Sequence, residues 1–241
     1  MRKYNYGSII LILIVNAIIS GILQNIADGN LSILSGFVAF IFDYIICRGL
    51  LYNREGSFSD YFRGIKTMTG KVFLMNILVG AITVTLILLA TFASGAGFLL
   101  TSYAVNSPKI FISFVVLIAL VTIFTSLLFA YMNFFMADER YRDLTFFDSL
   151  KLILKAGIKL FSESFMAGVK AYKITLLTGV IALVTGILSM KAPAAAVFAI
   201  IFGVIAAIAL FLCTPPFRAS LSDIYMDRAE EIYNEVIGCE D

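Results

Sequence analysis

The chain alternates between long runs of apolar residues and shorter polar segments. An α-helix rises about 1.5 Å per residue, so about 20 apolar residues cross the hydrocarbon core of a bilayer. Runs of this kind cover residues 8–26, 31–51, 72–98, 110–136 and 194–213. A further run ends near Met190, and its start is ambiguous because Lys170 and Lys173 lie within it. We therefore predict an all-α membrane protein with six transmembrane helices in one domain over residues 1–241.

Short polar stretches separate some of these runs and are predicted to be turns. They lie at 27–30, 100–109 and 191–193, and they contain Gly, Asn, Ser and Pro. Pro215 and Pro216 are predicted to stop the sixth span, because proline lacks the amide hydrogen that continues a helix. A separate polar helix is then expected over residues 220–238.

One polar segment is written twice, beginning at Arg54 and again at Arg142. A constant offset of about 88 residues relates the two copies. Matched positions include Ser57 and Thr145, Asp60 and Asp148, and Lys71 and Lys159. The duplicated unit is predicted to be span, amphipathic helix, span, with approximate limits 31–99 and 110–190. Both units would cross the membrane in the same sense, which predicts a parallel pseudo-repeat about an axis along the membrane normal.

Each copy opens with the spacing of a helix capping box, a hydroxyl residue followed three positions later by a carboxylate. The hydroxyl can accept a hydrogen bond from a free backbone N–H, and the carboxylate favours the positive end of the helix. We interpret these carboxylates as caps in preference to catalytic groups. The three predicted helix starts are Ser57 with Asp60, Thr145 with Asp148, and Ser220 with Asp223.

The basic residues predict the orientation of the chain. Of the 18 Lys and Arg, only Lys109 and Lys191 fall in the turns that follow the third and fifth spans, and the turn after the first span has none. Positive residues concentrate on the cytosolic side of membrane proteins. We therefore expect a multi-pass protein with both termini in the cytosol.

The second copy of the repeated segment is amphipathic. Its apolar positions recur at helical spacing: Phe146, Leu150, Ile153, Leu154, Ile158 and Phe161. Lys151, Lys155 and Lys159 run beside them, and the first copy carries Arg63 and Lys66. Such a helix suits a membrane surface, with apolar groups among lipid tails and lysines at anionic headgroups. Two interpretations stay open: an elbow that positions the next span, or a docking surface for lipid headgroups or a cytosolic partner.

Asp43 lies well inside the second span and is a candidate functional site. A charge within a membrane helix is costly, so it needs a partner or a role. The expected partners are Arg48, about one turn nearer the cytosol, or Lys170 and Lys173 in the fifth span. The alternatives are a structural ion pair, snorkelling lysines, a ligand or ion site, and a span boundary that differs from the one predicted here.

Composition narrows the chemistry. The chain is 61% hydrophobic and 14% charged and contains no His, the commonest general base. Cys47, Cys213 and Cys239 have no metal-type spacing, and no catalytic motif is present. We expect no enzyme activity, no cofactor, no metal and no nucleic-acid partner.

Three stretches carry a family resemblance. They are SFSDYFRGIK at 57–66 with the preceding Arg48-Gly49, residues 131–138 followed by 148–151, and the ending over 215–233. Together they resemble a large bacterial family of six-span membrane proteins of unknown function, related to the membrane domain of some glycerophosphodiester phosphodiesterases. The resemblance implies a bacterial cytoplasmic membrane and the six-span architecture. It implies no phosphodiesterase activity, because the soluble catalytic domain is lacking here.

The leading hypothesis is a non-catalytic integral membrane protein that binds lipid or a membrane or cytosolic partner through its cytosolic amphipathic helices. A helper, scaffold or immunity-type factor would fit. The alternative is a transporter or permease component with a polar site near Asp43. An intramembrane enzyme is the third hypothesis, and it would require a polar cavity with a positioned nucleophile.

Overall fold

The computed structural model describes residues 2–26, 32–93, 108–189, 192 and 194–238. Every regular element among these residues is a helix. In chain order they are α1 (Tyr6–Ile26), α2 (Ser32–Tyr52), α3 (Phe58–Phe62), η1 (Arg63–Thr67), α4 (Gly70–Ala93), α5 (Pro108–Leu128), α6 (Met132–Ala137), η3 (Glu139–Tyr141), α7 (Phe146–Lys159), α8 (Phe161–Ser189) and α9 (Ala194–Val236). The predicted turn at 27–30, and most of the turns at 100–109 and 191–193, lie outside the described residues.

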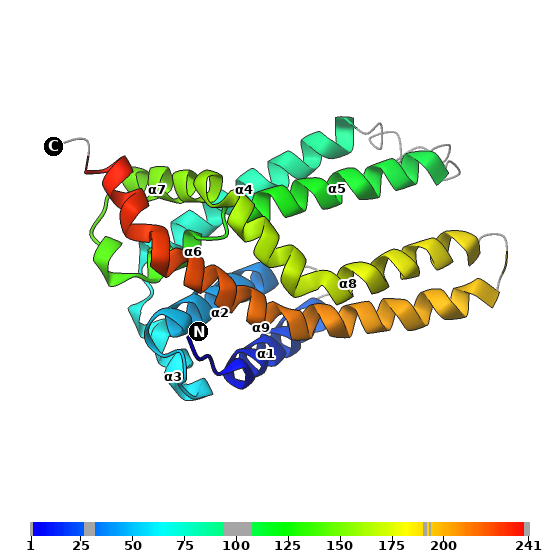
Figure 1. Ribbon diagram of the computed structural model, residues 1–241, viewed down its shortest axis with the longest axis horizontal. Coiled ribbons are helices and arrows are strands. Elements are labelled where there is room, and N and C mark those ends of the chain that lie inside the picture. The colour runs from blue at the N-terminus through cyan, green and yellow to red at the C-terminus, as the bar shows by residue number, and fades with distance from the viewer. Residues whose placement is uncertain (1, 27–31, 94–107, 190–191, 193, 239–241) are drawn as a thin grey trace.

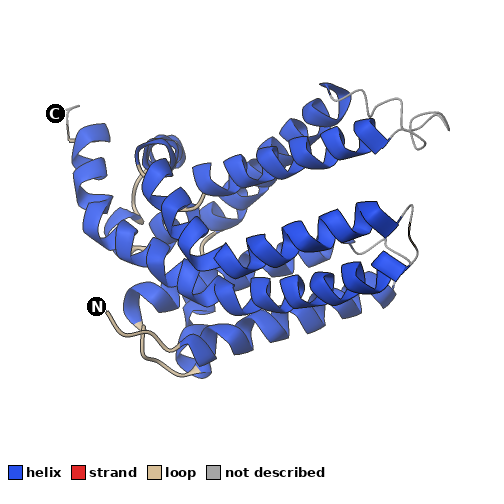
Figure 2. Cartoon of the chain, turned by 45° about the vertical axis from the view of Figure 1, so that its right-hand side comes forward, coloured by secondary structure: helices blue, strands red, loops and turns tan. Residues whose placement is uncertain are grey.

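The long helices pair as hairpins α1–α2, α4–α5 and α8–α9, which extend in one direction from a shared base (Figure 1). The base consists of α3, η1, α6, η3, α7 and the C-terminal part of α9, and we call it the polar end. Away from the polar end, α4–α5 and α8–α9 diverge from each other (Figure 2). Six of the described helices are long and apolar enough to cross a membrane, which confirms the six predicted spans.

The hairpins expose large apolar side chains over most of their length. Phe92, Leu177 and Ile200 are 71%, 64% and 67% exposed. Contiguous apolar surface of this extent is rare on soluble monomers and is the normal surface of a helix in lipid. The chain is therefore a multi-pass membrane protein.

The well-packed core lies in the polar end and is aromatic. Six of its largest fully buried side chains come from α2, α3, α6, the turn before α6, and α9: Tyr44, Tyr61, Tyr131, Phe134, Phe135 and Tyr225. Phe135 and Tyr225 meet edge to face with ring centroids 4.8 Å apart. Buried tyrosine hydroxyls need partners, and Tyr131 has one in the Ser164 hydroxyl at 2.6 Å. This core joins the hairpins to one another.

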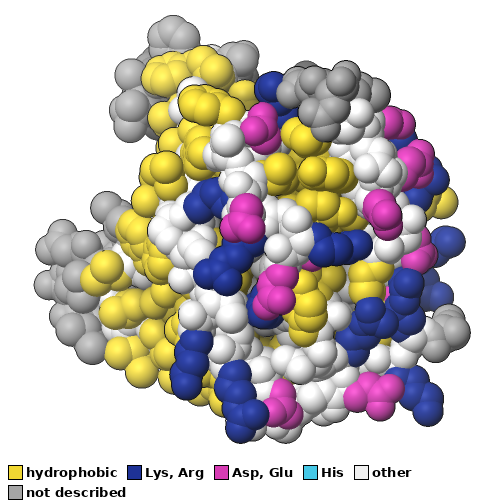
Figure 3. Space-filling view, turned by 90° about the vertical axis from the view of Figure 1, so that its left-hand side faces the viewer, with side chains coloured by type: hydrophobic (Ala, Val, Ile, Leu, Met, Phe, Trp, Pro, Cys, Tyr) yellow, Lys and Arg dark blue, Asp and Glu magenta, His cyan; other side chains and the backbone are white. Residues whose placement is uncertain are grey.

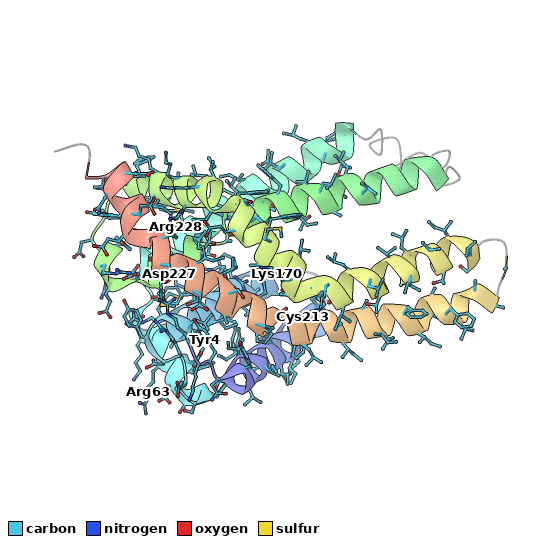
Figure 4. The ribbon with its side chains drawn as sticks, in the orientation of Figure 1. Tyr4, Arg63, Lys170, Cys213, Asp227 and Arg228 are labelled. Carbon is cyan, nitrogen blue, oxygen red and sulfur yellow. The ribbon has the colours of Figure 1, made fainter. Side chains whose placement is uncertain are left out.

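The sixth span and the terminal polar helix form one helix, so the predicted stop at Pro215 and Pro216 is wrong. α9 runs without interruption through both prolines and bends near Cys213 (Figure 4). A proline removes one backbone hydrogen bond and kinks a helix, and the rest of the ladder can continue past it. Ser220 is not a helix cap, since its hydroxyl donates to the carbonyl of Pro216 within the helix at 2.9 Å.

Two of the three predicted caps are confirmed. The Asp60 carboxylate accepts from the Ser57 amide at 2.9 Å, and the Thr145 hydroxyl accepts from the Asp148 amide at 3.2 Å. Beyond the caps the two segments differ, because the short α3 passes into η1, whereas α7 continues for 14 residues. The internal repeat therefore stays a prediction.

The extents of two spans become clear in the structure. α8 begins at Phe161, so the ambiguous start of the fifth span lies before Lys170 and Lys173, and both lysines are inside this helix. The fourth apolar run is broken by a turn at 129–131, which separates α5 from the short, fully buried α6.

Candidate functional site

A polar network ties four elements together near the boundary between the spans and the polar end. Asp43 of α2 forms an ion pair with Arg218 of α9. Its carboxylate also accepts a hydrogen bond from the amide of Asn133 in α6 at 2.6 Å. Asn76 of α4 donates to the side-chain oxygen of Asn133 at 3.2 Å. The charge of Asp43 is thus neutralised and hydrogen-bonded, which is what a carboxylate at this depth requires.

The predicted partners of Asp43 are wrong. The guanidinium of Arg48 donates instead to the carbonyl of Ala137 at 2.7 Å and to Glu139 at 2.5 Å, and it lies over the Tyr52 ring. The sequence interpretation passed over Arg218 because Pro215 and Pro216 were expected to end the helix before it. Since α9 continues, Arg218 keeps helical register and faces α2.

An open groove lies between the first part of α8 and the bent part of α9. Its volume is about 620 Å³, within the usual range for small-molecule sites. Its apolar wall includes Met166, Ala167, Ala171, Pro216 and Ile224, and its polar groups are Ser162, Glu163, Lys170 and Ser220. Figure 4 shows Lys170 on the part of α8 between the polar end and the projecting hairpin. The structure therefore places Lys170 in a mixed polar and apolar groove, and the ion-pair partner of Asp43 is Arg218 instead.

The position of Lys170 matches the edge of a hydrocarbon layer. From Lys170 to the end of α8 at Ser189 the helix rises about 28 Å, close to the thickness of a bilayer core. Lys170 is an exposed residue of this helix, and so is Lys173 one turn deeper, which does not line the groove. A lysine at this level can hold its ammonium among lipid phosphates.

Two lysines of α7 are held by carboxylates of α9. Lys159 contacts Glu231 at 2.8 Å and Glu235 at 2.5 Å, and Lys155 lies 3.9 Å from Glu235. The hydrogen bonds to Glu231 and Glu235 raise the pKa of Lys159 above its ordinary value. Lys151 lies 3.9 Å from Asp148 in its own helix. Two of the three lysines that were predicted to face lipid headgroups or a partner therefore form ion pairs within the protein.

The apolar positions of α7 also differ from expectation. Ile153 is fully buried, and Phe146, Leu150 and Leu154 pack against the core. The prediction that these groups lie among lipid tails is therefore wrong. A helical apolar stripe is the same signal whether it faces lipid or a neighbouring helix. Only Ile158 of that stripe is strongly exposed, at 67%.

The basic residues of the first copy lie at the surface of the polar end. Arg63 is 76% exposed and 3.5 Å from Asp60, and Lys66 is exposed. Figure 4 shows Arg63 at the periphery, and Figure 3 shows basic and acidic side chains interspersed across this face with apolar patches between them. The face carries both signs of charge and does not form a single basic patch.

A buried carboxylate was missed by the sequence interpretation. Asp138 is 3% exposed and accepts hydrogen bonds from Tyr225 at 3.0 Å, Tyr52 at 3.3 Å and Arg140 at 2.7 Å. Burial raises the pKa of Asp138, but the hydrogen bonds and charge of Arg140 outweigh it, so the pKa lies below its ordinary value. The residues around Asp138 have the composition of a polar loop, and nothing local in the sequence marks Tyr225 as the hydrogen-bond partner of Asp138.

The N-terminal segment is fastened to α9. The Arg2 guanidinium contacts Asp223 at 3.0 Å and Asp227 at 2.7 Å. The Tyr4 hydroxyl donates to Asp223 at 2.6 Å, and burial together with this bond raises the pKa of Tyr4. Asp223 therefore binds the N-terminal segment and does not cap a helix.

The described residues contain no group of three or more His, Cys, Asp or Glu side chains that could hold a metal ion. Cys47 is buried and Cys213 is partly buried, both as free thiols, while Cys239 lies outside the described part of the chain. No protein-family model matches the chain, and no match was found among curated proteins or solved structures.

Proposed function

We propose that the protein is a non-catalytic membrane protein that binds a phospholipid in the groove between α8 and α9. The supporting observation is the position of Lys170, a groove-lining cation about one bilayer-core thickness from the far end of its helix. Beyond the groove, α8 and α9 expose large apolar side chains such as Ile174, Leu177 and Leu212, along which acyl chains would lie. The lipid phosphate would contact the Lys170 ammonium. A lysine near the membrane surface contributes about 1 kcal/mol to the binding of anionic lipid.

The proposal includes an orientation and a cellular setting. The scarcity of basic residues in the predicted external turns supports a cytosolic polar end, with both termini inside. The resemblance to a bacterial six-span family supports the bacterial cytoplasmic membrane. The mixture of charges on the polar end suits a helper or scaffold that also contacts a cytosolic protein (Figure 3). The contact would include the exposed Arg63 and Lys66 and the exposed side of α7.

Retention of a phospholipid by variants of α8 tests this proposal. The protein is purified in mild detergent, depleted of lipid, and titrated with phosphatidylglycerol while native mass spectrometry counts bound lipids. Lys170→Gln should reduce lipid retention about fivefold, which corresponds to about 1 kcal/mol. Lys173→Gln is the matched control, because Lys173 is also exposed on α8 but does not line the groove. Equal retention by the wild type and Lys170→Gln would refute the proposal.

A further inference from the structure

The charges that line the groove are arranged in a fixed order along α8. Glu163 lies in the first turn of α8, at the polar end. Lys170 lies seven positions further along α8, toward its end at Ser189. Seven residues are almost two full helical turns, so both side chains leave the helix on one side. The axial distance between the two positions is about 10 Å.

This order matches the chemistry of one class of lipid headgroup. In a phospholipid the phosphate is attached next to the glycerol and acyl chains, and any headgroup amine lies farther from the hydrocarbon. A phosphate at Lys170 would therefore place a headgroup ammonium toward Glu163. A two-carbon linker between phosphate and amine, with a hydrogen bond of about 3 Å at each end, spans a comparable distance.

We propose that the groove selects a zwitterionic phospholipid whose headgroup ends in a primary ammonium, with its phosphate at Lys170 and its ammonium at Glu163. This inference rests on the proposed function and adds the identity of the headgroup. The ammonium has three N–H donors, and the groove offers it the carboxylate of Glu163 with the hydroxyl of Ser162 beside it.

The lining disfavours a quaternary ammonium. Proteins recognise trimethylated ammonium groups with cages of aromatic rings. The residues that line the groove in the described part of the chain include no aromatic side chain. A quaternary headgroup would also leave the Glu163 carboxylate without a hydrogen-bond donor from the ligand.

Glu163 keeps capacity for a ligand although it has a protein neighbour. Its carboxylate lies 3.6 Å from the guanidinium of Arg228, beyond the usual hydrogen-bond distance. Arg228 is closer to Glu231, at 2.9 Å. Arg228 therefore orients Glu163 from the side of α9 without occupying both carboxylate oxygens.

The test compares three lipids that share the same acyl chains and differ only in the headgroup. Delipidated protein is offered equimolar phosphatidylethanolamine, phosphatidylcholine and phosphatidylglycerol, and native mass spectrometry measures the share of each that is retained. The wild type should prefer phosphatidylethanolamine over phosphatidylcholine about tenfold, the effect of one charge-assisted hydrogen bond. Glu163→Gln should lose this preference, and Glu163→Asp should keep most of it.

Two controls separate the inference from its alternatives. Glu235→Gln removes a carboxylate of α9 that pairs with Lys155 and Lys159 and does not line the groove, and it should keep the preference. Soluble phosphoethanolamine in equal amount should not displace the lipid, and displacement would overturn the assignment of a lipid occupant.

The remaining outcomes distinguish the two proposals. Equal retention of the three lipids, lost in Lys170→Gln, would overturn the headgroup inference and leave the proposed function standing. Retention unaffected by Lys170→Gln would overturn both. A preference that survives in Glu163→Gln would overturn the assignment of Glu163 to the ammonium.

Discussion

The ion pair of Asp43 and Arg218 gives the sharpest prediction about stability. Asp43→Asn removes the carboxylate charge while keeping the side-chain shape and an oxygen that can accept from Asn133. The variant thus isolates the effect of leaving Arg218 without its counter-charge.

The size of the effect follows from burial. Removing one partner of a fully buried pair costs about 3–5 kcal/mol. The side chains of Asp43 and Arg218 are 25% and 27% exposed, so solvent lowers the expected loss to about 2–3 kcal/mol. Asp227→Asn is the matched control, since its pair with Arg2 is 62% exposed on the Asp227 side and should contribute less than about 1 kcal/mol. In the double variant Asp43→Asn, Arg218→Met, most of the stability should return, because no unpaired charge remains.

Cys47 provides the assay. Its thiol is fully buried one turn from Asp43, so it reacts with a fluorogenic maleimide only when the protein opens. A Cys213→Ser, Cys239→Ser background keeps Cys47 as the sole thiol. Asp43→Asn should melt clearly below the wild type, and Asp227→Asn close to it. A melting curve for Asp43→Asn that coincides with the wild type would refute the structural assignment. If Asp43→Asn melted like the wild type but abolished an ion flux across proteoliposomes, the transporter hypothesis would be favoured instead.

Two further predictions concern packing and pH. Gly157→Ala should lower the free energy of unfolding by about 1–3 kcal/mol, because the added Cβ would overlap the backbone carbonyl of Leu128. Gly179→Ala is the control and should not lower it, because a Cβ there meets nothing within 4 Å. Thermal melts in detergent compare the two variants. Since the pKa of Asp138 is lowered in the folded state from the ordinary 3.8, its contribution to stability is present above that pH and is lost as the pH falls further. Melting temperatures at pH 5 and pH 3 should therefore differ less for Asp138→Asn than for the wild type, and equal differences would contradict this role.

The spans could be predicted from the sequence because a long apolar run has few structural alternatives. The caps at Ser57 and Thr145 were also predictable, since a hydroxyl and a carboxylate three residues apart satisfy a helix end locally. Both features depend on neighbours in the chain.

The partners across helices could not be predicted in the same way. Whether Pro215 and Pro216 end or only bend a helix depends on what packs around them, and this decided whether Arg218 reached Asp43. The apolar stripe of α7 fits lipid and protein equally well, and the carboxylates Glu231 and Glu235 that meet its lysines lie more than 70 residues away. The groove needs α8 and α9 in register, which no local pattern contains.

The most direct test of the account is an electron cryomicroscopy map of the protein in nanodiscs that contain phosphatidylethanolamine and phosphatidylglycerol. We predict a lipid in the groove between α8 and α9, with its phosphate within hydrogen-bonding distance of the Lys170 ammonium and its chains along the exposed faces of both helices. A groove that is closed, or open with the ordered lipids bound elsewhere, would contradict the account.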